Sequence, residues 1–115
     1  MVSQKRILVP LGPQNNDLKG IYHALALAER MQAKILILQI EDQKDKNGTN
    51  GLKEKILLDL VNTASQEGLT VSHHIAYGVL GKEILDFIRK ESIELVVLGE
   101  DDQMARALLR IRSKV

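Results

Sequence analysis

Residues 33–40 read Ala33-Lys34-Ile35-Leu36-Ile37-Leu38-Gln39-Ile40, and this stretch decides the fold of the chain. Its centre, Ile35-Leu36-Ile37-Leu38, is four consecutive apolar residues without alternation. Such a run is expected of a strand that is covered on both faces, as in the middle of a parallel sheet. The segments on either side must therefore supply helices and further strands.

The segment before this strand predicts a strand and a helix. Residues 7–11, Ile-Leu-Val-Pro-Leu, form a short aliphatic strand that is closed by the turn Gly12-Pro13. Asn15, Asn16 and Asp17 then offer capping oxygens for a helix that ends near Gln32. Its sheet-facing stripe has helical spacing and consists of Ile21, Ala24, Leu25 and Ala28.

The segment after the central strand predicts two more strand and helix pairs. Residues 41–51 lack aliphatic side chains and indicate a surface loop. A helix over Leu52–Glu67, with Gly68 as its C-cap, presents the stripe Leu52, Ile56, Leu57, Leu60 and Ala64. Residues 69–76 alternate as an edge strand does. A third helix is lined by Ile84, Leu85 and Ile88, and a fourth strand covers residues 93–99.

Alternating strands and helices of this length predict an α/β fold with an open parallel sheet between two layers of helices. The 115 residues are enough for one domain, so we expect residues 1–115 to form a single unit. The tail, residues 103–115, is helix-prone and basic on one side, and we expect it to pack on the sheet or on a partner.

Composition excludes several classes of function. The net charge is only +1, and one Phe, two Tyr and no Trp offer almost no surface for base stacking, so we expect no nucleic-acid partner. The absence of Cys excludes disulfides and thiolate metal sites, and makes the cytoplasm the expected location. No signal peptide is expected, and no apolar run approaches the roughly 20 residues that a membrane span needs.

The residues that could carry out catalysis are few and scattered. His73 and His74 are adjacent on a strand, so their side chains should point to opposite faces, and His23 lies on a helix. No Ser or Thr lies in a Gly-x-Ser-x-Gly elbow. The sequence therefore predicts neither a metal site nor an enzyme.

The chain resembles the universal stress protein family over residues 5–110. The resemblance rests on four segments together: residues 5–11, the Ala-rich helix 23–30, residues 33–38 with Gly78 and Ile84 further on, and the strand Ile93-Glu94-Leu95-Val96-Val97-Leu98-Gly99. It implies a Rossmann-like sheet of order 3-2-1-4-5, of which this chain would hold 3-2-1-4. It also implies dimers through the last strand and, in one branch, an ATP site.

The sequence departs from the motifs of that ATP-binding branch. Where the branch has an Asp after the first strand, this chain has Gly12-Pro13, and where it has a second glycine after the fourth strand, this chain has Asp102. The acids Glu100, Asp101 and Asp102 would repel a phosphate, cap a following helix, or hold Mg²⁺ together with a phosphate. The candidate nucleotide-contacting residues are Leu11, Gly12, Pro13, Ile40, Gly78, Gly99 and Glu100.

Two functions follow from these features. The first is a non-catalytic regulatory or association domain without a cofactor, self-associating through the edge of the fourth strand or the tail, alone or as a module of a larger protein. The second is a stress sensor that still binds an adenine nucleotide, ATP or AMP, through backbone contacts of Leu11, Gly12, Ile40, Gly78 and Gly99.

Overall fold

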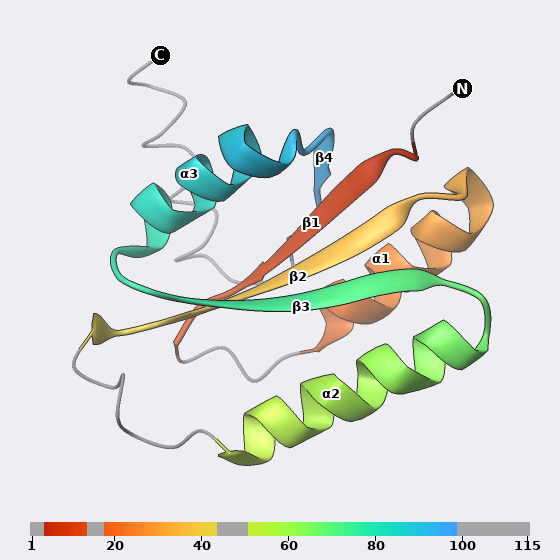
Figure 1. Ribbon diagram of the computed structural model, residues 1–115, viewed down its shortest axis with the longest axis horizontal. Coiled ribbons are helices and arrows are strands. Elements are labelled where there is room, and N and C mark those ends of the chain that lie inside the picture. Colours follow the sequence, from red (N-terminus) through yellow and green to blue (C-terminus); the bar gives the residue numbers. More distant parts are fainter. Residues whose placement is uncertain (1–3, 14–17, 44–50, 99–115) are drawn as a thin grey trace.

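The computed structural model describes residues 4–13, 18–43 and 51–98, and its elements alternate along the chain as the sequence predicts (Figure 1). The predicted tail helix, Gly99 and the acids that follow it lie outside the described residues. The elements are β1 (Arg6–Leu11), α1 (Lys19–Met31), β2 (Lys34–Glu41), α2 (Gly51–Gln66), β3 (Thr70–Tyr77), α3 (Leu80–Glu91) and β4 (Leu95–Val96).

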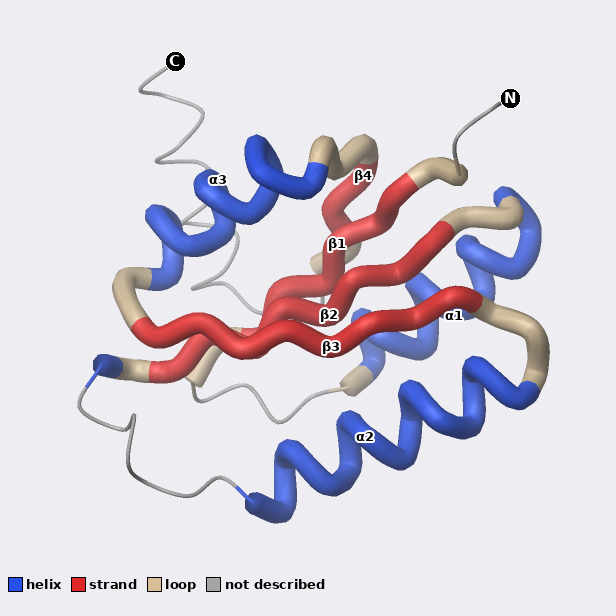
Figure 2. The backbone as a smooth tube through the Cα atoms, in the orientation of Figure 1, coloured by secondary structure: helices blue, strands red, loops and turns tan. Residues whose placement is uncertain are grey.

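The four strands form one parallel sheet in the order β3-β2-β1-β4, which confirms the predicted order (Figure 2). β2 lies inside the sheet, paired with β1 from Lys34 to Gln39 and with β3 along its whole length. Seven of its eight residues are buried. The apolar run that decided the fold is therefore a strand covered on both faces.

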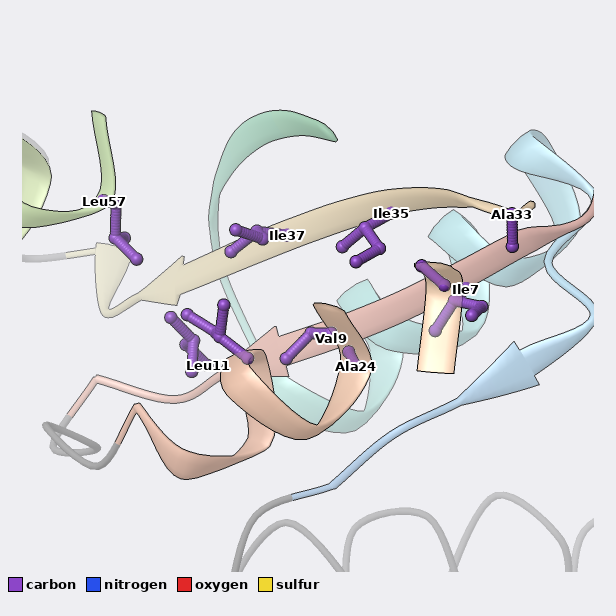
Figure 3. Packing of buried hydrophobic residues seen from close by; sticks show 10 residues of the cluster. Ile7, Val9, Leu11, Ala24, Ala33, Ile35, Ile37 and Leu57 are labelled. Carbon is purple, nitrogen blue, oxygen red and sulfur yellow. The ribbon is translucent and has the colours of Figure 1, made fainter. Parts of the chain in front are cut away.

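Helices α1 and α2 cover one face of the sheet, and α3 covers the other (Figure 1). On the first face, side chains of β1 and β2 pack with Ala24 of α1 and Leu57 of α2 (Figure 3). The strand residues are Ile7, Val9 and Leu11 of β1 and Ile35 and Ile37 of β2. The alternate residues of the same strands, among them Leu8, Leu36 and Ile40, pack with Ile84 of α3. Successive strand residues point to opposite faces, so two cores share one sheet.

The fourth strand is much shorter than the predicted range 93–99. Its ladder pairs only Leu95 and Val96 with β1, extended by backbone hydrogen bonds from Glu94 N to Arg6 O and from Val97 N to Leu8 O. The pairing thus ends before Pro10, which lacks an N–H group. A proline in this inner strand is tolerated because, among the described residues, no β4 residue pairs with it.

Two details of the helices differ from the sequence prediction. Leu18, which has no polar side chain, occupies the N-cap of α1, while the expected caps at residues 15–17 lie outside the described residues. In α2 the buried residues are Lys53, Leu57 and Ala64, whereas Leu52 and Ile56 of the predicted stripe are 74% and 40% exposed. The side of α2 that faces the sheet therefore includes Lys53 and excludes Leu52 and Ile56.

The end of α2 agrees with the sequence. Gly68 adopts a φ of 89°, and its N–H donates to Ser65 O at 3.0 Å while Leu69 N donates to Ala64 O at 3.0 Å. Only glycine takes this backbone conformation without strain, which makes it the usual residue at a helix end. Within the described residues no helix is both long and apolar enough to cross a membrane.

Candidate ligand site at the carboxyl edge of the sheet

The carboxyl ends of the parallel strands meet at one edge of the sheet, where β1, β2 and β3 end at Leu11, Glu41 and Tyr77. From β1 the chain passes through α1 to β2 on one side of β1, and it later returns to place β4 on the other side. The strand order therefore reverses between β1 and β4. In open α/β sheets the crevice at such a reversal is where ligands bind. This edge is therefore the place to test the predicted site residues.

Leu11 and Ile40 are core residues whose side chains face opposite sides of the sheet. Leu11 is 2% exposed and packs in the core beneath α1 and α2, while Ile40 is fully buried in the core beneath α3. The two side chains therefore cannot line one pocket together. Any contact with a ligand would have to come from the backbone.

The turn after β1 is held by a side chain of the protein itself. Gly12 is buried, Pro13 is half-buried, and the carbonyl oxygen of Gly12 accepts a hydrogen bond from Lys53 Nζ at 3.0 Å. Lys53 comes from the first turn of α2. This backbone acceptor at the turn is thus already in use within the chain.

Gly78, at the end of β3, is likewise engaged within the chain. Its N–H donates to the carbonyl oxygen of Glu41 at 3.0 Å. A Cβ atom at Gly78 would lie 2.5 Å from Oε1 of Glu83, so the carboxylate of Glu83 fills the space that the glycine leaves open. This space holds an acid of α3, which is unfavourable to a phosphate.

A polar cluster of three buried residues, Lys53, Glu41 and Gln39, and the half-buried His73 connects α2 with β2 and β3. Lys53 Nζ lies 3.3 Å from Glu41 Oε1, and the two side chains are 6% and 9% exposed. Gln39, fully buried, donates from Nε2 to the same Oε1 at 2.9 Å and accepts a hydrogen bond at Oε1 from His73 Nε2 at 3.0 Å. Because an amide oxygen only accepts, His73 carries its proton on Nε2.

Sequence reasoning missed this cluster. Its signal was weak but present: two polar residues, Gln39 and Glu41, on one face at the end of a largely apolar strand, and a lysine four residues before Leu57 on the buried side of α2. A buried charge requires a partner of opposite charge, so Glu41 and Lys53 could have been paired on that ground.

His73 and His74 point to opposite faces, as predicted. His73 contacts Gln39 on the side of α2, whereas His74 packs its ring edge-on against Phe87 of α3, with ring centres 5.1 Å apart. Burial lowers the pKa of both residues, and Lys53 lowers the pKa of His73 further while Glu54 raises it. In the described part of the chain no group of three or more His, Asp or Glu side chains is arranged to hold a metal ion.

An open groove of about 510 Å³ lies between α1 and the end of β4. The exposed side of α1 forms one wall, and Val97, which follows β4, forms the other. The lining residues are Tyr22, His23, Ala26, Leu27, Arg30 and Val97.

Comparisons with known proteins agree with this architecture. The family model described as the universal stress protein family matches residues 4–111. A universal stress family protein from Burkholderia pseudomallei is 18% identical, with a TM-score of 0.69 over 94% of this chain and 89% of its own. The Archaeoglobus fulgidus universal stress protein in complex with dAMP is 16% identical, with a TM-score of 0.66 over 95% and 91%.

A universal stress protein in complex with cAMP is 13% identical, with a TM-score of 0.59 over 84% of this chain and 73% of its own. A comparison with curated proteins found no match. At these identities the solved structures establish the shared fold, and the family model covers nearly the whole sequence. This chain belongs to the universal stress protein family.

Proposed function

We propose that this universal stress protein domain is non-catalytic and acts in the cytoplasm through association, alone or as a module of a larger protein, with its nucleotide crevice closed. One observation carries the proposal: two of the predicted contact points at the carboxyl edge, the Gly12 carbonyl and the space above Gly78, are occupied by Lys53 and Glu83 of the chain itself. A nucleotide would have to displace both.

Charge at the edge supports the same function. The ammonium of Lys53 is paired with Glu41 and is not free to bind a phosphate. The acid Glu83 lies over Gly78, and the sequence continues after the fourth strand with Glu100, Asp101 and Asp102. Phosphate binding in α/β folds relies on free N–H groups and cations, and at this edge the Lys53 ammonium is already engaged by Glu41 and the Gly12 carbonyl.

A thermal-shift titration with adenosine, AMP and ATP, each with and without Mg²⁺, tests the closed crevice. A ligand that binds only the native state raises the free energy of unfolding, by about 2.7 kcal/mol at a concentration a hundredfold above Kd, and the melting temperature rises with it. We expect no rise with any of the three. A saturable rise with ATP or AMP would overturn the proposal.

The second candidate is a sensor that binds an adenine nucleotide, and the dAMP and cAMP complexes of two structural relatives favour it. In this function Lys53 and Glu83 would swing out when the nucleotide enters. A melting-temperature rise with ATP that requires Mg²⁺ would assign the acids to the metal. A rise with adenosine alone would indicate a base pocket without phosphate contacts.

We further propose that the association surface is the outer edge of β4. Among the described residues no strand pairs with that edge, Leu95 is 38% exposed, and the groove along α1 adjoins it. Exposed strand edges tend to pair with another strand or to be covered. We expect wild-type protein to sediment as a dimer and Leu95→Asp to shift it toward monomer.

Leu58→Asp is the matched control, because Leu58 is 55% exposed on α2, away from β4. It should leave the sedimentation coefficient unchanged. A concentration-independent monomer in the wild-type protein would contradict association through this edge.

A further inference from the structure

The buried ammonium of Lys53 lies among oxygen atoms in the manner of a bound ligand. It donates to the Gly12 carbonyl at 3.0 Å and lies 3.3 Å from the Glu41 carboxylate, and the whole residue is 7% exposed. These contacts join three separate segments: the turn after β1, the end of β2 and the start of α2. A buried ammonium requires such compensation, because removing it from water is costly.

The oxygen atoms around Lys53 are oriented by other residues. Gln39 donates to Glu41 Oε1, the same oxygen that faces Lys53, and His73 donates to the amide oxygen of Gln39. The amide of Gln39 is thereby fixed in one orientation, with its N–H groups toward the carboxylate. Glu41 Oε1 is therefore bound by Gln39 as well as by Lys53.

We propose that the Gly12 carbonyl and the Glu41 carboxylate form a primary-ammonium site, which Lys53 fills from within its own chain. The tethered ammonium fastens α2 to the turn after β1 and acts as an internal occupant of the crevice. The inference deepens the proposed function, on which it rests for the statement that the crevice is closed.

The chemistry of the site selects against nucleotides and in favour of amines. A competing group must carry a positive charge, to neutralise Glu41, and N–H donors directed at two oxygen atoms. A phosphate would meet the Glu41 carboxylate, and a quaternary ammonium has no N–H to donate. The ligand class that fits the emptied site is a primary alkylammonium ion.

Chemical rescue tests the proposal. Lys53→Ala keeps Cβ and removes three carbons and the ammonium, which n-propylammonium replaces atom for atom. We expect the melting temperature of Lys53→Ala to fall by on the order of 10 °C, because Glu41 is left buried without its cation. Millimolar n-propylammonium should restore a saturable part of that loss and leave the wild-type melting temperature unchanged.

Three controls separate a specific site from general solvent effects. Lys55→Ala removes an exposed lysine from the same helix and should neither lose stability nor respond to the amine. Tetramethylammonium and n-propanol, which lack the N–H groups and the charge respectively, should not rescue Lys53→Ala. The double variant Lys53→Ala/Glu41→Gln should not respond to n-propylammonium, since the carboxylate is gone.

A melting temperature of Lys53→Ala equal to that of Lys55→Ala, or equal rescue by n-propanol, would overturn the proposal. If Lys53→Ala does not fold, Lys53→Met, which keeps the length of the stem, takes its place. Its melting temperature should lie below that of the wild type, whereas Lys55→Met, at the exposed lysine of the same helix, should not lower it. A Lys53→Met melting temperature equal to that of Lys55→Met would also overturn the proposal.

Rescue of the Lys53→Ala melting temperature by n-propylammonium and nucleotide binding by the wild-type protein are two separate measurements. A wild-type protein that binds ATP would refute the closed crevice, yet n-propylammonium could still rescue Lys53→Ala and establish the ammonium site. A failed rescue with no nucleotide binding would refute the site and leave the proposed function standing.

Discussion

The two halves of β2 are equally buried but are stabilised by different interactions. Ile35, Leu36, Ile37 and Leu38 are at most 1% exposed and pack against apolar side chains of the two cores. Gln39 and Glu41, 0% and 7% exposed, instead depend on a lysine from α2 and a histidine from β3. The apolar half supports the two cores, and the polar half places a buried ion pair at the carboxyl edge.

The largest expected effect comes from the polar half. Glu41→Gln preserves shape but leaves the ammonium of Lys53 buried without a carboxylate, so we expect a loss of about 3 kcal/mol in the free energy of unfolding. Urea denaturation at pH 7 measures it. A loss under about 1 kcal/mol would mean that the two halves do not differ as described.

The matched change in the apolar half should cost less. Ile37→Val removes one methylene group from a fully packed position, and we expect a loss of about 1 kcal/mol, from the lost transfer free energy and the small cavity left behind. The same urea titration gives the value. A cost larger than that of Glu41→Gln would reverse the comparison.

A smaller effect is expected at Gly78, where the closing side chain is flexible. An added Cβ would meet Oε1 of Glu83 at 2.5 Å, the far end of a side chain that can turn away, and φ of Gly78 is not positive. Gly78→Ala should therefore change stability by under about 1 kcal/mol. Thermal unfolding of Gly78→Ala with and without Glu83→Ala checks this, since the steric cost should vanish in the double variant.

The smallest effect is the pH dependence that His73 contributes. Burial lowers the pKa of His73 in the folded state below its ordinary value of 6.5, because the folded protein favours the neutral ring. The stability that the neutral ring contributes is therefore complete above pH 6.5. Stability should decline as the pH falls through and below that value. His73→Gln should make the decline between pH 7 and 5 shallower, and an unchanged slope would argue against a role for His73.

The fold could be predicted because its signals are local. The unbroken apolar run of β2, the turn at Gly12 and the αL cap at Gly68 each specify an element from a few neighbouring residues, and strand order followed from the family resemblance. β4 was predicted too long. A largely aliphatic segment, residues 93–99, does not reveal that only Leu95 and Val96 pair in the ladder with β1.

The site could not be predicted in the same way. Helix α2 carries apolar residues on several sides, so periodicity alone favoured Leu52 and Ile56 over Lys53 as inward-facing positions. The choice is made by Glu41, which lies twelve residues earlier in the chain and outside the helix. A pattern search within one element cannot contain that interaction.

The most direct test of the closed crevice is to observe the ammonium of Lys53 by ¹⁵N NMR while ATP with Mg²⁺ is added, using Lys55 as the exposed reference. Hydrogen-bonded, buried ammonium protons exchange slowly with water, so we predict a resolved Lys53 signal that does not move with ATP and no comparable signal from Lys55. A Lys53 signal that exchanges as fast as that of Lys55, or that shifts on saturation with ATP, would contradict an internally occupied crevice.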